Sequence, residues 1–267
     1  LGDGILTSQG ASWRWQRRTA APLFRPADLA ALVPVMSAAA EEQIARWERA
    51  PAGVLHPIDQ VMTETTFRVI SATMFAGSAD AEADAILHSA DIALSSISWD
   101  IAAAMLRFPE WLWYPGKYRR RRAGRNLRHA VSTILSRRRA HDGEAHDLLG
   151  RLIGARDPDT GQPMSEKQLI DNLVTFLAAG HETTAKALTW SLYLLARAPE
   201  WQHRIRREVR EVAGTSQIDA GQLERLTITR AVLEEAMRLY PPAPVMTRQV
   251  GVDTELGGMA PPAGGGL

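Results

Sequence analysis

The sequence contains no cysteine among its 267 residues. Disulfide bonds, thiolate metal sites and cysteine nucleophiles are therefore excluded within this chain. It also lacks an apolar run of about 18 residues, the length that a membrane-spanning helix requires, and it has almost no charge imbalance, with a net charge of +1. With 45% hydrophobic and 23% charged residues, what remains is the composition of an ordinary globular chain.

The two ends predict a fragment of a longer chain. The sequence starts at Leu1 with neither a methionine nor a basic and apolar leader, and it stops in the glycine and proline stretch "GGMAPPAGGGL" (257–267), where a strand or turn should continue. No linker or internal repeat divides the sequence. We therefore expect one partial domain over residues 1–267.

Helical patterns follow one another along most of the chain. Prolines and glycines mark many of their ends, and Pro34 should kink or split the first turn of its helix. Residues 109–115 should form a turn or lid with aromatic side chains, and 156–165 a loop rich in Asp, Pro and Gly. Helices are predicted over residues 26–50, 57–77, 80–106, 116–141, 145–155, 166–198, 199–214 and 226–242. The predicted fold class is mainly α.

The longest of these helices should run through the core. Ser165 is its expected N-cap, Gln168 completes a capping box, and Pro199 prevents it from continuing. Most of its circumference is apolar. The stretch "AAGHETTAKAL" (178–188) nevertheless places a glycine, which costs about 1 kcal/mol relative to alanine in a helix, beside an acid and two threonines.

This polar cluster has a structural and a functional interpretation. In the structural one, Gly180 permits close helix packing, the threonines donate hydrogen bonds to carbonyls one turn earlier, and Glu182 pairs with Lys186. In the functional one, the glycine leaves room for a ligand in an apolar wall, and the acid and the hydroxyl of Thr183 pass protons. The zinc-protease pattern His-Glu-x-x-His is excluded, because residue 185 is alanine.

Near the start, "SWRWQRRTAAPLF" (12–24) sets Trp13 and Arg17 four residues apart. An indole N–H and a guanidinium can then point to one side of a helix, and arginine is suited to a bidentate grip on a carboxylate. An amphipathic helix with a basic face would produce the same pattern.

Near the end, "EEAMRLYPP" (234–242) sets Glu235 and Arg238 three residues apart on one helical face. Such pairs are common on solvated helices, and Glu234 could equally form an ion pair with Arg238. The helix should stop at the two prolines, and an extended segment carrying Arg248 should follow.

Taken in order, these stretches resemble the cytochrome P450 haem-thiolate monooxygenases. "SWRWQRRTAAPLF" is similar to the family's C helix with its Trp-x-x-x-Arg motif. "AAGHETT" is similar to its I helix (Ala/Gly-Gly-x-Asp/Glu-Thr-Thr), and "EEAMRLYPP" is similar to its K helix (Glu-x-x-Arg). "TRQVGVDTELGGMAPPAG" (247–264) resembles the strands that follow the K helix, and "IDQVMTETTFRVISATMFAG" (58–77) resembles the E helix. The resemblance implies a fragment of the cytochrome P450 fold, from the C helix through the K helix and the start of the following strands.

The resemblance also implies a cofactor, heme b (iron-protoporphyrin IX), and the residues that bind it. Trp13 and Arg17 would hydrogen-bond one haem propionate and Arg248 the other. Ala179, Gly180 and Thr183 would line the distal face.

The same resemblance implies the chemical roles. Glu182 would exchange protons with solvent, and Thr183 would steady bound oxygen while protons reach it. Glu235 and Arg238 would belong to a buried structural network beneath the haem.

The family's iron ligand is a cysteine in a loop that follows these strands, so the resemblance places it downstream of residue 267. Within this chain no metal ligand is expected, and as given it should be inactive. Of the histidines and methionines that could still bind iron, His181 should be the one nearest the polar cluster at 180–184. Part of the apolar face of residues 169–195 should also be uncovered.

The implied activity is a monooxygenase that inserts one atom of O2 into an apolar small molecule. Electrons would come from NAD(P)H through a ferredoxin, a flavodoxin or a flavoprotein reductase. The lack of a membrane anchor resembles the soluble, cytoplasmic bacterial members, although an anchor could precede residue 1.

Two other functions remain as alternatives. From Lys117 to Arg139 there are ten lysines and arginines and no acids, which could form a surface for nucleic acid or anionic membranes. Leu127, Val131, Ile134 and Leu135 recur there at helical spacing, so a basic amphipathic helix is the preferred interpretation and no nucleic acid is expected. The second alternative is a non-catalytic helical binding module.

Overall fold

The computed structural model describes residues 2–75, 86, 88–90, 92, 116–140, 148–157, 159–245, 248 and 250–260. These residues are mainly helical, as predicted. The helix predicted at 80–106 lies largely outside them, and the turn or lid at 109–115 lies wholly outside. The elements are α1 (Gly10–Ala20), η1 (Ala21–Phe24), α2 (Pro26–Ala30), α3 (Val33–Arg49), α4 (Ile58–Phe75), α7 (Lys117–Ala140), α8 (Leu148–Gly154), α9 (Glu166–Ala196), α10 (Pro199–Ala213), α11 (Ala220–Leu223) and α12 (Thr227–Leu239).

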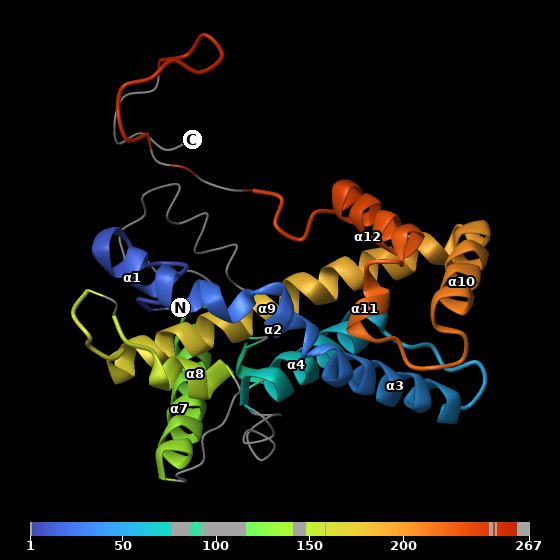
Figure 1. The fold of residues 1–267 in the computed structure, drawn as a ribbon, viewed down its shortest axis with the longest axis horizontal. Coiled ribbons are helices and arrows are strands. Elements are labelled where there is room, and N and C mark those ends of the chain that lie inside the picture. The colour runs from blue at the N-terminus through green and yellow to red at the C-terminus, as the bar shows by residue number, and fades with distance from the viewer. Residues whose placement is uncertain are drawn as a thin grey trace.

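The long helix α9 runs through the middle of the molecule, and the other helices are arranged around it (Figure 1). Its predicted start is confirmed. The Ser165 hydroxyl oxygen accepts from the Gln168 N–H, and the Gln168 side-chain oxygen accepts from the Ser165 N–H. The helix ends at Ala196, before Pro199. Its 31 residues span about 46 Å at 1.5 Å per residue.

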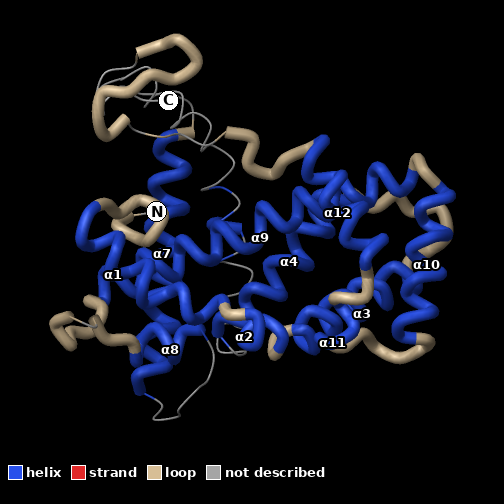
Figure 2. The backbone as a smooth tube through the Cα atoms, turned by 45° about the horizontal axis from the view of Figure 1, so that its top comes forward, coloured by secondary structure: helices blue, strands red, loops and turns tan. Residues whose placement is uncertain are grey.

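The core lies where α4, α7 and α8 pack against the first half of α9 (Figure 2). These helices contribute apolar side chains at helical spacing. The basic helix α7 takes part in this packing, since its apolar stripe is almost fully buried. The buried members from these four helices are Phe67, Met74, Phe75, Leu127, Val131, Ile134, Leu135, Leu149, Leu152, Leu169, Leu173, Val174 and Leu177.

Pro34 has the predicted effect on the helix expected over 26–50. That segment is divided into α2 and α3, and Pro34 occupies the first turn of α3, where its missing N–H has no intrahelical partner to lose. The strands expected after α12 are reduced, within the described residues, to one antiparallel bridge between Leu256 and Met259. Gly257 and Gly258 join them with φ of 56° and 80°, as a tight hairpin turn requires.

The segment before α1 is fastened to α9 by two adjacent polar residues. The Asp3 N–H donates to Asp171 at 2.7 Å, and the Ile5 N–H donates to Asn172 at 3.0 Å. The Asp171 side chain is fully buried and also pairs with Arg128 of α7 and with Lys167. Burial alone would raise the pKa of Asp171, but these hydrogen bonds outweigh it and hold the pKa below its usual value.

The start of α12 is capped by a neighbouring helix. Leu226 at its N-cap position provides no side-chain hydrogen bond. Instead Glu208 of α10 accepts from the N–H of Ile228 at 2.6 Å and from the N–H and hydroxyl of Thr229. Burial would raise the pKa of Glu208, but these donors lower it below its usual value. A carboxylate is favoured there by the free N–H groups and the dipole of the helix start.

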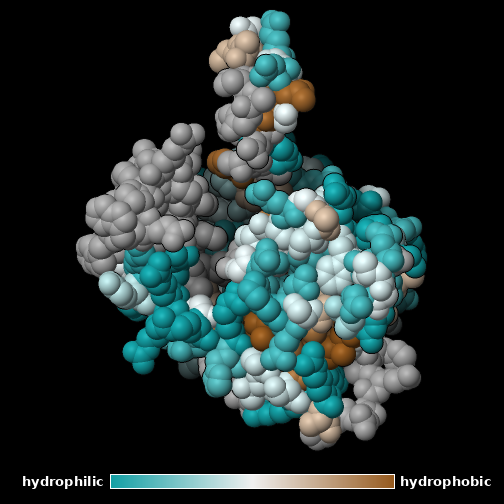
Figure 3. Space-filling view, turned by 90° about the vertical axis from the view of Figure 1, so that its left-hand side faces the viewer, coloured by the Kyte–Doolittle hydropathy of each residue, from teal (hydrophilic) through white to brown (hydrophobic). Residues whose placement is uncertain are grey.

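The apolar surface of α9 is unevenly covered, as predicted. Its first half is buried, whereas Trp190 and Tyr193 in its second half are 37% and 42% exposed. Trp190 stacks on Tyr240 with ring centroids 4.0 Å apart. The face of the molecule shown in Figure 3 is mostly hydrophilic, and hydrophobic residues reach its surface only in small areas.

Candidate functional site

The polar cluster of α9 presents a narrow stripe of small residues. Seven residues make roughly two turns and eleven roughly three, so Asn172, Ala179 and Thr183 lie along one side of the helix. Asn172 is buried, whereas Ala179 and Thr183 are exposed. We call the stripe formed by Ala179 and Thr183 the notch. It is an open stripe that directly follows the packed first half of the helix.

The contacts of the structural interpretation are present except at Thr184, whose hydroxyl makes no hydrogen bond within the described residues. The Thr183 hydroxyl donates to the Ala179 carbonyl at 2.7 Å, and Glu182 lies 3.7 Å from the Lys186 ammonium group. A Cβ on Gly180 would lie 2.9 Å from Cδ1 of Ile70, so the glycine permits the close approach of α4. None of these contacts fills the notch, and the two interpretations are therefore compatible.

Helix α1 is docked on the same side of α9 as the notch. The Asn172 side-chain amide donates to the Gln16 side-chain oxygen at 2.7 Å, and Gln16 in turn donates to the Asp3 carbonyl at 3.2 Å. Sequence reasoning did not select Gln16 or Asn172. The only available signal was an amide beside Asp171 at the buried start of a long helix.

The three predicted anion donors lie on exposed surfaces. Trp13 and Arg17 share one exposed side of α1, while Trp15 and Gln16 are buried. Arg248 lies in the segment after α12 and is also exposed. No hydrogen bond among the described residues joins Arg248 to Trp13 or Arg17. Their roles remain predictions.

His181 is adjacent to the notch in sequence, but its side chain faces away from it. Nine residues separate it from Asn172, or roughly two and a half turns. The imidazole is 1% exposed, packs edge-on against Phe67, and has Nδ1 2.7 Å from the Leu177 carbonyl oxygen. Because only a protonated nitrogen can donate to a carbonyl, this contact requires the proton on Nδ1.

Glu235 and Arg238 form the predicted pair, but not in a buried network. Two hydrogen bonds of 2.7 Å join the carboxylate and the guanidinium, and the side chains are 55% and 67% exposed. This pairing lowers the pKa of Glu235 and raises the pKa of Arg238. The pair lies on the outer side of α12, since the residue of α12 that is buried is Ala236.

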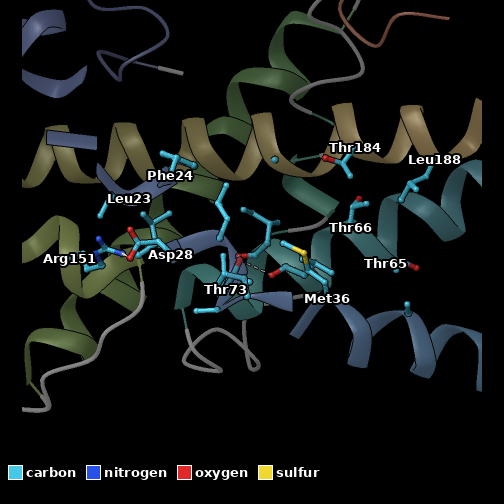
Figure 4. A pocket seen from close by; sticks show the side chains of 18 residues that line it. Leu23, Phe24, Asp28, Met36, Thr65, Thr66, Thr73, Arg151, Thr184 and Leu188 are labelled. Atoms are coloured by element: carbon cyan, nitrogen blue, oxygen red, sulfur yellow. Dashed lines mark hydrogen bonds and ion pairs between the residues drawn. The ribbon is translucent and has the colours of Figure 1, made fainter. Parts of the chain in front are cut away.

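A groove of about 730 Å³ lies between η1, α2, α3, α4, α8 and α9 (Figure 4). On α9 it is lined by Gly180, Thr184 and Leu188, a stripe roughly 100° around the helix from the notch. Most of its lining is apolar, and the ion pair between Asp28 and Arg151 lies at one end. The groove and the notch are therefore separate features of α9.

The basic segment is a packing helix. Leu127, Val131, Ile134 and Leu135 of α7 are buried, as the preferred interpretation required. Arg128 pairs with Asp171 and Arg139 with Glu166. Part of the charge is thus neutralised within the protein, and no observation favours the nucleic-acid alternative.

Two remaining features are clusters of metal-binding side chains and helices that could cross a membrane. Within the described ranges, no three His, Cys, Asp or Glu side chains are grouped so that they could hold a metal ion. No single helix in the same ranges is long and apolar enough to cross a membrane. Taken together, the segments Gly10–Phe24 and Pro26–Arg49 are long and apolar enough by length and composition only, but they are bent by 52° relative to each other.

The helical arrangement matches that of part of a solved haem domain. The crystal structure of the cytochrome P450DA heme domain matches with a TM-score of 0.83 and 26% identity, covering 99% of this chain and 58% of that one. The profile of the cytochrome P450 family matches residues 1–265. The chain therefore belongs to the cytochrome P450 family, as its motifs suggested.

Two relatives illustrate the range of the family. Cyclooctat-9-en-7-ol 5-monooxygenase from Streptomyces melanosporofaciens is 34% identical over 265 residues, which cover 99% of this chain and 57% of the relative. The bifunctional cytochrome P450/NADPH–P450 reductase ALT2 from Alternaria alternata is 31% identical over 252 residues, covering 91% and 23%. The chain thus spans little more than half of the first relative and of the solved haem domain.

Proposed function

We propose that this chain forms the oxygen-binding side of a haem-dependent monooxygenase that acts on an apolar small molecule. The observation that carries the proposal is the notch. A small residue and a threonine hydroxyl lie open on one stripe of α9 just after its buried first half, an acid is adjacent in sequence, and α1 with its two anion donors is docked on the same side. Family membership supplies the chemistry that this arrangement serves.

The residues present fit a haem in two respects. Ala179 and Thr183 leave an exposed stripe that a flat ring can cover, and the N–H donors of Trp13, Arg17 and Arg248 suit two carboxylate anions. In one respect the chain is insufficient, because it has no cysteine to act as thiolate ligand. We propose that sequence beyond residue 267 supplies this ligand.

When bound, the haem supplies the electron transfer and the splitting of O2 that insert one oxygen atom into the substrate. The chain's own residues handle protons. The Thr183 hydroxyl donates to the Ala179 carbonyl, so its oxygen is free to accept a hydrogen bond from a donor on the notch side. The Glu182 side chain is 36% exposed and held loosely by Lys186, so it can take protons from solvent and pass them toward the notch.

The partners are part of the same proposal. The relatives named above support a small organic substrate and a flavoprotein electron donor, because one is named for the oxygenation of an alcohol and the other carries its own reductase. A separate ferredoxin or flavodoxin would serve equally well. The apolar side chains that dominate α9 favour an apolar substrate.

The first test is the carbonyl spectrum of the reduced protein. A longer protein that contains this chain and the proposed cysteine should give the thiolate-type spectrum with carbon monoxide. Residues 1–267 alone, mixed with haem and reductant, should not, because thiolate donation is what produces it. A thiolate-type spectrum from the cysteine-free chain, or none from the longer protein, would contradict the proposal.

The second test is haem retention. Trp13→Ala, Arg17→Ala and Arg248→Ala should each lower the haem content of the longer protein, because a charge-assisted hydrogen bond contributes roughly 1.5–3 kcal/mol. The ratio of haem to protein absorbance measures the loss. Arg14→Ala, on the same helix, is the control and should retain haem. Full haem content in all three variants would show that the propionates are held elsewhere.

A further inference from the structure

Helix α4 contacts α9 directly behind the notch through one turn of its own. Phe67 packs edge-on against the His181 imidazole, with ring centroids 5.9 Å apart. Ile70 fills the space that a side chain on Gly180 would occupy. Thr66 makes the third contact, and it is polar. These three residues touch the two positions of α9 that immediately precede Glu182 and Thr183.

The Thr66 hydroxyl joins the two helices by a hydrogen bond. It lies 2.9 Å from the His181 carbonyl oxygen, in a fully buried contact between residues 115 positions apart. The same hydroxyl lies 2.9 Å from the Met62 carbonyl and 3.2 Å from that of Thr63 in its own helix. A hydroxyl has a single proton to donate, and the contact to α9 is the one that can fix one helix relative to the other.

A second threonine of α4 provides a comparison. The Thr73 hydroxyl lies 2.8 Å from the Val69 carbonyl and 3.1 Å from the Ile70 carbonyl, which repeats the local contacts of Thr66. Among the described residues, the Thr73 hydroxyl makes no hydrogen bond to α9. The two residues therefore differ in the bond that crosses between the helices.

The position of that bond on α9 gives it a specific consequence. The His181 carbonyl belongs to the peptide unit that leads into Glu182, and its ordinary helical partner is the N–H of Ala185. Apolar contacts at Gly180 and His181 set how closely the helices approach, but they resist sliding and rotation only weakly because they are not directional. A buried hydrogen bond is directional and fixes the height and rotation of this turn.

We propose that Thr66 is a positioning residue for the notch: its bond to the His181 carbonyl holds the turn of α9 that presents Glu182 and Thr183. It acts through the backbone of α9 and not by contact with substrate or haem. The inference rests on the proposed function, because the notch must serve oxygen chemistry for its position to matter.

The test compares Thr66→Val, Thr66→Ser and Thr73→Val in the longer haem protein. Valine keeps the branched shape and removes the hydroxyl, whereas serine restores the hydroxyl. Amide hydrogen exchange of residues 178–187 should accelerate roughly fivefold in Thr66→Val, which corresponds to one lost hydrogen bond. It should stay at the parent rate in Thr73→Val and return toward it in Thr66→Ser.

A second measurement separates positioning from stability alone. The probe is carbon monoxide bound to the reduced protein, whose infrared stretching band responds to the polar groups beside it. The band should shift or broaden in Thr66→Val and in Thr183→Ala, and remain unchanged in Thr73→Val. Equal exchange in Thr66→Val and Thr73→Val, or an unchanged band in Thr66→Val, would overturn the role of Thr66 while the proposed function stands. A parent protein without a thiolate-type spectrum would overturn both.

Discussion

Thr183→Ala is expected to leave oxygen consumption largely intact in the longer protein, while product yield falls and peroxide rises. The hydroxyl is the polar side-chain group of the notch; it donates its proton to the Ala179 carbonyl, and its oxygen can accept a hydrogen bond from a proton donor on the notch side. A positioned proton-transfer group contributes a factor of roughly 100 or more to its step. Product per oxygen consumed should therefore fall at least about tenfold.

Thr184→Ala is the matched control for that experiment. Its hydroxyl is one residue away but faces the groove with Gly180 and Leu188, so coupling should remain near the parent value. Oxygen, peroxide and product are measured together for both variants. Equal uncoupling in the two would indicate a general weakening of α9, and unchanged coupling in Thr183→Ala would remove the role assigned to its hydroxyl.

The largest stability effect is expected for Asp171→Asn. The replacement has nearly the same shape but removes a fully buried charge that pairs with Arg128 and Lys167 and accepts from the Asp3 N–H. Because the carboxylate is fully buried while Arg128 and Lys167 remain partly exposed, the cost should approach about 3 kcal/mol, the lower end of the range for a broken buried pair. Denaturant unfolding of the longer protein measures it. In Asp159→Asn, which removes an exposed partner of Arg18, the loss should be under about 1 kcal/mol.

The contribution of Asp171 also has a defined pH dependence. Because its pKa is lower in the folded protein than the ordinary value of 3.8, its stabilisation is fully present above that value. It is lost as the pH falls from about 4 through the folded pKa. Below pH about 4 the parent should lose stability more steeply than Asp171→Asn. Parallel curves would show that another carboxylate governs the acid transition.

Local chemistry made much of the helical framework predictable. Ser165 with Gln168, and Pro34, act within a single helical turn, so the start of α9 and the division between α2 and α3 followed from the sequence. The Glu235 and Arg238 pair was predicted for the same reason, but its exposure was not, since exposure depends on which elements cover α12.

The site was only partly predictable, because its contacts join distant segments. Helical spacing placed Ala179 and Thr183 on one stripe, and motif order identified the family. The same spacing puts His181 on the opposite side, yet its polarity suggested that it belonged to the notch. Nothing local indicated that Gln16 would meet Asn172, or that Thr66 would reach the His181 carbonyl, since each pair is separated by more than 100 positions.

The capping of α12 by Glu208 has a consequence for the order of folding. Its contacts join residues about 20 positions apart, so α10 and α12 can form early as one local unit, with little loop entropy to overcome. The notch has the opposite character. The bonds that dock α1 and α4 on α9 span 156 and 115 positions. We therefore infer that α1 and α4 dock on α9, and so complete the surroundings of the notch, after α10 and α12 have formed their unit.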